Sequence, residues 1–194
     1  MHPDEDTSPA PEDLEVLRTF LSLHDHERSR PEGLEPSAAT MRWWLREHGL
    51  LGGRARIPPD EIVWALRIRD ALRTRIRERM DGAPPDPAMA RMLEQAARDC
   101  GIGPSFARSA GEPLRVDAAG VRGAVGRLLG AAFLAELDGR WERFRICGDP
   151  GCGSVFYDRS TNRSGRWCLM SVCGNRAKAR AFRARRASRS AQRE

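Results

Sequence analysis

Residues 147–152 read CGDPGC, and residues 168–173 read CLMSVC. The stretch therefore holds two Cys-x4-Cys pairs with fifteen residues between them. Gly148, Pro150 and Gly151 favour a tight turn inside the first pair. Structural zinc in proteins is tetrahedral and takes four Cys or Cys/His ligands from two short-spaced pairs. The four cysteines predict one structural Zn²⁺ held by Cys147, Cys152, Cys168 and Cys173, with no position left open for a catalytic water.

Three other uses of four cysteines stay open at this point. Disulfides need an oxidising compartment, and the N-terminus shows no charged segment followed by an apolar one that would indicate export. Iron–sulfur clusters also take four cysteines, although their ligands are usually closer in sequence. A redox switch is the third alternative, because zinc-bound thiolates can be oxidised.

The chain becomes strongly basic around the second cysteine pair. From Arg159 to Glu194 it carries eleven basic residues and one acidic residue, a net of +10. The net charge of the whole chain is +6, so residues 1–158 carry about −4. A mildly acidic domain with a basic tail is typical of a protein that binds a polyanion.

The stretch from Cys147 to Arg180 resembles the CGNR zinc-finger family. The resemblance is carried by the cysteines together with residues 155–160, 162–164, 166–168 and 173–180, which include Cys173-Gly174-Asn175-Arg176. It implies an N-terminal helical domain followed by the finger, in bacterial transcription regulators linked to stress. Upstream, Trp44-Leu45, Gly49-Leu50-Leu51, Ala65-Leu66-Arg67 and Ala71-Leu72-Arg73 fit the pattern of that N-terminal domain. Ser22-Leu23 departs from the Asn-Thr pair that the family tends to carry, which puts any ligand site there in doubt.

The chain is predicted to be mainly α, with three parts. Residues 1–12 form an acidic, disordered tail, and residues 13–140 form a helical domain that is a candidate for ligand sensing and dimerisation. Residues 141–194 form a small treble-clef-like zinc finger with four cysteine ligands, ending in a basic helix. Apolar spacing and capping residues predict helices over 12–23, 37–48, 58–80, 86–101 and 117–137, and a last helix from about Cys173 to Arg189. A hairpin of 105–107 with 114–116, turning at Gly111, and a strand over 141–146 complete the pattern.

Several other features have ordinary structural explanations. We expect Cys100 to be a buried thiol, and His24-Asp25-His26-Glu27 to be a solvated loop rather than a metal site. Trp43, Trp44 and Trp64 are expected in the core, with an aromatic ligand pocket as the alternative. The arginines of the long helix (Arg67, Arg69, Arg73, Arg75, Arg77 and Arg79) are expected on a solvated face.

The sequence shows no catalytic motif and no apolar run long enough to cross a bilayer. We therefore expect no enzyme, no membrane partner, and a cytoplasmic, nucleoid-associated protein.

The leading hypothesis is a zinc-dependent regulator that binds duplex DNA as a homodimer, with a possible small-molecule effector in its N-terminal domain. The predicted contacts to DNA are Arg159, Arg163, Arg166, Arg176, Lys178, Arg180, Arg183, Arg185 and Arg186. Asn175, Asp158 and Trp167 are expected to support the finger. The alternatives are an RNA-binding or ribosome-associated protein, a module that docks an acidic protein partner, and a small-molecule sensor with little DNA contact.

Overall fold

The computed structural model describes residues 9–23, 38–52, 57–106 and 113–191. The described helices are α1 Glu12–Ser22, α2 Ala38–Glu47, α3 Pro59–Asp81, α4 Pro87–Asp99, α5 Gly120–Leu137 and α6 Asn175–Ala191, with a 3₁₀ turn at Arg140–Arg143 and a π-helical turn at Met170–Gly174. Two antiparallel hairpins pair β1 Ile102–Pro104 with β2 Leu114–Val116, and β3 Phe144–Ile146 with β4 Val155–Tyr157. The mainly helical fold that the sequence predicts is therefore confirmed. None of the described helices is long and apolar enough to cross a membrane.

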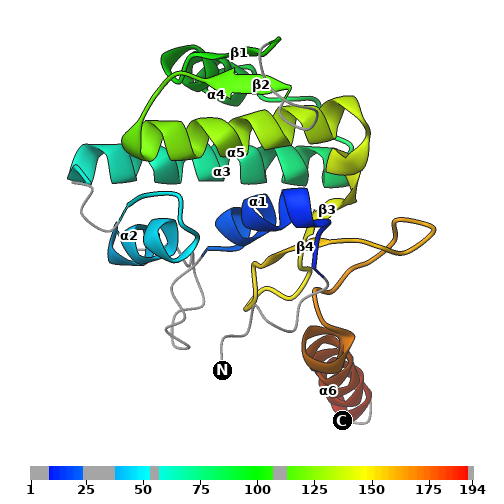
Figure 1. Cartoon of the computed structure of the whole chain (residues 1–194). Helices are drawn as coiled ribbons and strands as arrows, with labels where there is room; N and C mark the ends of the chain where they lie inside the picture. Colours follow the sequence, from blue (N-terminus) through cyan, green and yellow to red (C-terminus); the bar gives the residue numbers. More distant parts are fainter. Residues whose placement is uncertain (1–8, 24–37, 53–56, 107–112, 192–194) are drawn as a thin grey trace.

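The two long helices α3 and α5 lie side by side in the middle of the molecule (Figure 1). Helix α4 and the β1–β2 hairpin cover one side of this pair, and α1 and α2 cover the other. The β3–β4 hairpin follows at one end, and α6 extends away from the body.

Most helix ends lie where the capping residues predict them. Asp86 caps α4 by accepting a hydrogen bond from the N–H of Ala88 at 2.7 Å. Gly82 and Gly101, with φ of +66° and +62°, end the α3 and α4 segments in the left-handed conformation that glycine adopts without strain.

Several boundaries differ from the prediction. The strand predicted over 141–146 begins only at Phe144, because Arg140–Arg143 form a 3₁₀ turn. The first hairpin strand begins at Ile102 rather than at residue 105, because the turn at Gly101 reverses the chain at once. Helix α5 begins at Gly120 rather than at Asp117. The N–H groups of Asp117 and Ala118 both donate to the carbonyl of Cys100, which keeps this segment extended. Gly111, the predicted turn residue, lies outside the described residues, as do His24–Glu27 and Ser37.

The core forms along α1, α3 and α5, with two exceptions among the predicted core residues. Cys100 and Trp44 are buried as predicted. The apolar spacing of α5 predicts a buried stripe of Val121, Val125, Leu128, Leu129 and Phe133, and the first four are buried. Phe133 of α5 is 54% exposed, because it lines a groove of about 720 Å³ between α4 and α5 instead of the core. Trp43 is also exposed, since it lies one position away from the buried face that Trp44 and Met41 occupy.

The prediction of a solvated arginine face on α3 is wrong for three of its arginines. Arg69 is only 3% exposed and donates to the carbonyl of Leu23. Arg73 donates to the carbonyls of Leu21, at 2.5 Å, and Gly153, at 2.8 Å. Arg79 donates to the carbonyls of Trp141 and Phe144. Carbonyl groups at the ends of helices and strands lack partners within their own element. An arginine side chain is long and carries enough N–H donors to bind two of them.

Strand β4 belongs to two cores at once. Val155 and Tyr157 pack in the core of the helical domain, whereas Phe156 between them packs with the cysteines. Successive side chains of a strand point to opposite faces, so three residues are enough to join the two clusters. Phe144 and Ile146 of β3 also lie in the helical core, which therefore extends across the predicted boundary at residues 140 and 141.

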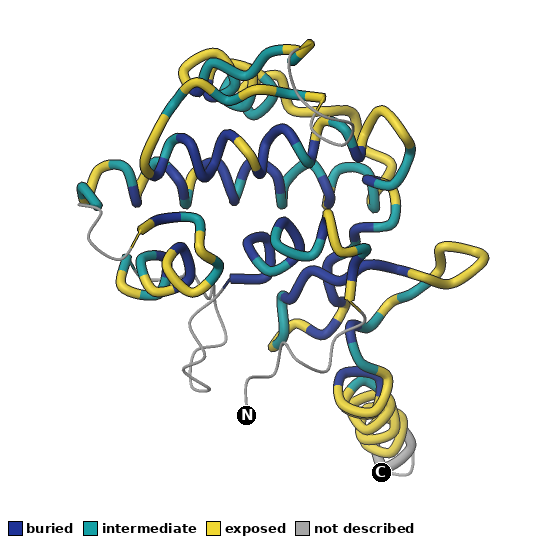
Figure 2. Tube along the Cα trace, in the orientation of Figure 1, coloured by how far each residue is buried: buried dark blue, intermediate teal, exposed yellow. Residues whose placement is uncertain are grey.

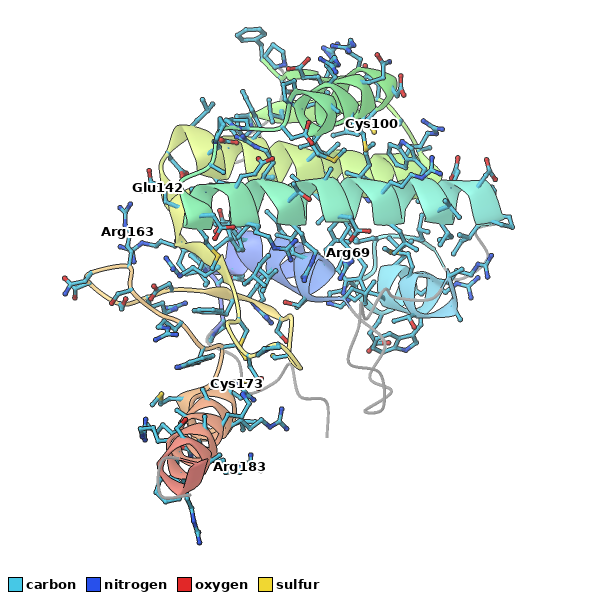
Figure 3. All side chains as sticks on the ribbon, turned by 180° about the vertical axis from the view of Figure 1, so that it is seen from behind. Arg69, Cys100, Glu142, Arg163, Cys173 and Arg183 are labelled. Carbon is cyan, nitrogen blue, oxygen red and sulfur yellow. The ribbon has the colours of Figure 1, made fainter. Side chains whose placement is uncertain are left out.

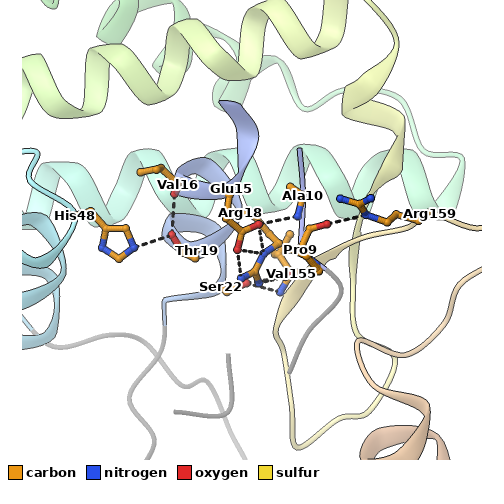
Figure 4. Close-up of polar contacts among 10 residues, drawn as sticks. All are labelled: Pro9, Ala10, Glu15, Val16, Arg18, Thr19, Ser22, His48, Val155 and Arg159. Atoms are coloured by element: carbon orange, nitrogen blue, oxygen red, sulfur yellow. Dashed lines mark hydrogen bonds and ion pairs between the residues drawn. The ribbon is translucent and has the colours of Figure 1, made fainter. Parts of the chain in front are cut away.

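Helix α1 holds β4 through Ser22 (Figure 4). The hydroxyl of Ser22 donates to the carbonyl of Val155 at 2.7 Å and accepts from the N–H of Val155 at 3.1 Å. Both residues are buried, and Arg18 donates to the same carbonyl at 3.4 Å. Ser22, at the position where the sequence departs from the family that it resembles, thus joins the helical domain to the finger.

We expect Ser22→Ala to lower the free energy of unfolding by about 1–3 kcal/mol, because it leaves the N–H of buried Val155 without its partner. The measurement is urea denaturation of the metal-loaded protein. Ser188→Ala, on the exposed side of α6, is the matched control and should change stability by less than about 0.5 kcal/mol. Equal effects of the two substitutions would contradict the role of Ser22.

Candidate metal centre and basic helix

The structure brings the four predicted cysteines together. Their Sγ atoms all lie within 4.8 Å of one another, with 3.5 Å between Cys152 and Cys168 and 3.7 Å between Cys168 and Cys173. A tetrahedral zinc with Zn–S bonds of about 2.3 Å would hold its sulfurs about 3.8 Å apart. The described cysteines form no disulfide. This donor set fits one metal ion that prefers sulfur ligands.

Without a cation, Cys147, Cys168 and Cys173 would keep their protons, because their pKa values are raised. The pKa of Cys152 is lowered instead, by its hydrogen bonds with Cys147 and Cys168. Burial, followed by the neighbouring Cys152 and Cys147, raises the pKa of Cys173 to about 12. The pKa of Cys168 is also raised, first by its hydrogen bond with Cys147. Four thiolates cannot share so small a buried space unless positive charge compensates them. A divalent cation supplies that charge and displaces the protons, so metal affinity should fall as the pH is lowered.

The first cysteine pair is shaped by a tight backbone turn. The N–H of Cys152 donates to the carbonyl of Asp149, and the N–H of Cys147 donates to the carbonyl of Ser154, both at 2.9 Å. Gly148 donates to the carbonyl of Arg166 at 2.8 Å, which ties the first pair to the approach of the second. A Cβ at position 148 would lie 3.2 Å from that carbonyl and from the Trp167 ring, so a glycine fits here best.

The loop between the two pairs is held by Asp158. This buried carboxylate accepts hydrogen bonds from the N–H of Ser160 at 2.9 Å and of Gly165 at 2.7 Å. Burial opposes its ionisation, but the hydrogen bonds from Ser160 and Gly165 lower the pKa of Asp158 overall. Trp167 packs against the cysteine cluster, with the Arg166 guanidinium 5.1 Å from its ring centre. Asp158 and Trp167 therefore both lie where they stabilise the finger.

The second pair leads directly into α6. The N–H groups of Cys173 and Gly174 both donate to the carbonyl of Leu169, which forms the π-helical turn between the cysteines. Asn175 begins α6 and donates from its amide to the carbonyl of Ser171 at 2.8 Å. Figure 3 shows Cys173 at the junction of the finger and this helix. The cysteine cluster therefore determines where the basic helix starts.

Asp149 makes a second connection, which the sequence analysis did not find. Its side chain lies inside the first cysteine turn and is 2% exposed. It pairs with Arg180 at 3.0 Å and with Arg176 at 3.6 Å, both from the first two turns of α6. The i, i+4 spacing of these arginines was the available signal, because it places both on one face of a helix. Asp149 thus links the direction of α6 to the turn of the first cysteine pair, residues 147–152.

The predicted nucleic-acid contacts fall into two groups. The three arginines of the loop make contacts within the chain: Arg159 with the carbonyl of Pro9, Arg163 with Glu142, and Arg166 with Trp167. The six predicted cations of α6 are all exposed, and the helix contacts the rest of the chain mainly through the π-helical turn before it. Figure 2 shows α6 as an exposed rod beside the body.

The groove between α4 and α5 is lined mainly by apolar residues, with Arg75, Glu94, Arg98 and Glu136 among them. Arg75 and Glu136 form an ion pair at 2.6 Å. None of Trp43, Trp44 and Trp64 lines this groove. The aromatic pocket that the sequence offered as an alternative is therefore not the one found here.

We expect Asp149→Asn to loosen α6 without releasing the metal, because it removes the charge that holds Arg176 and Arg180. Amide exchange in the first two turns of α6 should become about fivefold faster, which corresponds to about 1 kcal/mol for partly exposed ion pairs. Hydrogen exchange read by mass spectrometry measures it, and Asp117→Asn, at an exposed position, is the matched control. Unchanged exchange in α6 would contradict this role of Asp149.

Comparison with known families agrees with this architecture. The model of the CGNR zinc finger matches residues 143–186. The model named ABATE, described as "putative stress-induced transcription regulator", matches residues 14–138, more than half of the chain. A search of curated proteins found no match. The order of the two matches confirms the resemblance seen in the sequence, and the chain belongs to the ABATE family, with a CGNR zinc finger as its C-terminal part.

Proposed function

We propose that this protein is a transcription regulator whose single structural Zn²⁺ directs α6 onto duplex DNA. The observation that carries the proposal is the exposed α6, a helix of seventeen residues that begins just after the last cysteine and carries cations along its length. Zinc is favoured because it is the metal that four thiolates in tetrahedral spacing most often hold in structural sites.

The charge distribution of α6 supports a polyanionic partner. Arg176 and Arg180 face Asp149, whereas Lys178 and Arg185 lie on the opposite side of the helix. Across the described part of the chain, no ion pair involves Lys178 or Arg185. Their charges are thus available to phosphates, and a helix about 10–12 Å wide fits a major groove about 12 Å wide.

One helix offers few base contacts, so selective binding would require two copies. A homodimer reading two half-sites is the arrangement we propose, with the helical domain as the dimerising part. The groove between α4 and α5 is the place where we would look for an effector. A cytoplasmic location follows from this proposed role in transcription.

We expect the purified protein to contain about one zinc ion per chain. The Cys173→Ser variant should contain little or no zinc, because a tetrahedral site that lacks one ligand binds the metal far more weakly. Elemental analysis after extensive dialysis measures the metal. Cys100→Ala removes the one cysteine outside the cluster and should keep the full zinc content. Iron in place of zinc, or equal metal in both variants, would refute the assignment.

Binding of the protein to random-sequence duplex DNA should weaken steeply as salt is added, because counterions are released from each contacted phosphate. It should disappear when a chelator removes the zinc that holds α6 in place. Arg185→Ala should weaken binding at every sequence and lower the salt slope by about one. Arg91→Ala, on exposed α4 at the far side of the molecule, is the matched control.

The same titration separates the proposal from its alternatives. Tighter binding to RNA than to duplex DNA would favour an RNA-binding protein. No binding to either polymer would leave α6 as a docking element for an acidic protein.

A further inference from the structure

Helix α6 carries one large apolar side chain that the described part of the chain leaves largely uncovered. Phe182 is 60% exposed, and its neighbours along the helix are alanines and cations. Single exposed apolar side chains are common on proteins, but Phe182 lies among cations on the helix that we propose to bind DNA, where covering its ring would add favourable binding free energy. The occupant must also accept the positive charges around it.

The helical spacing places Phe182 on a defined face. Lys178, Phe182 and Arg185 occupy positions i, i+4 and i+7 and therefore lie along one side of α6. Arg176 and Arg180 mark the other side, where they meet Asp149. At about 100° per residue, Phe182 lies about 140° around the helix from the midpoint of these two arginines. The ring thus points away from the finger, between two cations.

We propose that Phe182 determines sequence preference by packing on the 5-methyl group of thymine in the major groove. This inference rests on the proposed binding of α6 to duplex DNA and names the chemistry of its readout. Charge complementarity selects the partner, because Lys178 and Arg185 flank the ring and would lie towards phosphates while it faces the base edges.

The major groove offers one apolar feature that matches such a ring. Each thymine presents a C5-methyl group there, and phenylalanine is among the side chains that contact it. Cytosine carries only a hydrogen at C5, and the purines present mainly hydrogen-bonding groups at their major-groove edge, so neither offers a methyl group for the ring to cover. An apolar side chain in the centre of a cationic face therefore selects for the methyl group and not merely for a phosphate backbone.

The experiment compares duplexes that differ only in this methyl group. An alternating A·T duplex of about 24 base pairs, a little over two helical turns, is titrated against the same duplex with deoxyuridine in place of every thymidine, using the zinc-loaded full-length protein. The phosphate charge and the hydrogen-bonding groups are the same in both. We expect the wild-type protein to bind the thymidine duplex about fourfold more tightly for each methyl group buried by the ring.

Phe182→Ala should bind the two duplexes equally, while Phe182→Leu should keep part of the preference. Alanine is a good helix former, so the substitution leaves α6 intact. Phe106→Ala is the matched control, because Phe106 is 97% exposed and lies on the β1 side of the molecule, away from α6. The Phe106→Ala variant should keep the wild-type ratio of affinities for the thymidine and deoxyuridine duplexes.

The outcomes separate this inference from the function on which it rests. Equal wild-type affinities for both duplexes, or a thymidine preference that survives Phe182→Ala, would overturn the role of Phe182 and leave DNA binding standing. No binding to either duplex would overturn the proposed function itself. If Phe182→Ala dissociates a dimer and leaves the ratio of affinities for the two duplexes unchanged, the inference is overturned and this face of α6 is assigned to a second copy of the chain.

Discussion

Four thiol groups within 4.8 Å of one another impose the constraint on which the C-terminal third of the chain depends. Without a metal, the thiols of Cys147, Cys168 and Cys173 keep their protons, because their pKa values are raised, and a bound cation would displace these protons. A metal held by all four cysteines would connect the turn that contains Asp149 with the turn from which α6 begins. Since α6 has few contacts with the body, its direction follows from these two points alone.

The finger is joined to the helical domain by apolar packing and by buried hydrogen bonds. Strand β4 turns Phe156 towards the cysteines and Val155 and Tyr157 towards the helices. Ser22 satisfies both backbone groups of Val155, and Arg73 spans from the end of α1 to Gly153 in the metal turn. A shift of α1 or α3 would therefore move the turn that holds the first cysteine pair. This gives the helical domain a physical route by which an effector could change the position of α6.

Much of this architecture could be predicted from local signals. The cysteine spacing, the Asp86-Pro87 helix start and the basic composition after Cys173 each depend on residues close in sequence, and the structure agrees with all three. The failures involve long-range contacts. Arg69, Arg73 and Arg79 occur in a pattern typical of a solvated face, and only the folded chain brings carbonyls of Leu23, Gly153 and Phe144 to them. The Asp149 ion pairs have the same origin, because only the folded chain brings the first cysteine turn next to Arg176 and Arg180.

X-ray absorption at the metal edge of the purified protein would reveal which atoms bind the metal. We expect a zinc ion with four sulfur neighbours at about 2.3 Å and no nitrogen or oxygen ligand. Fewer than four sulfurs, with light atoms completing the shell, would contradict it. In that case the cysteine cluster would not be the closed structural site from which α6 takes its direction.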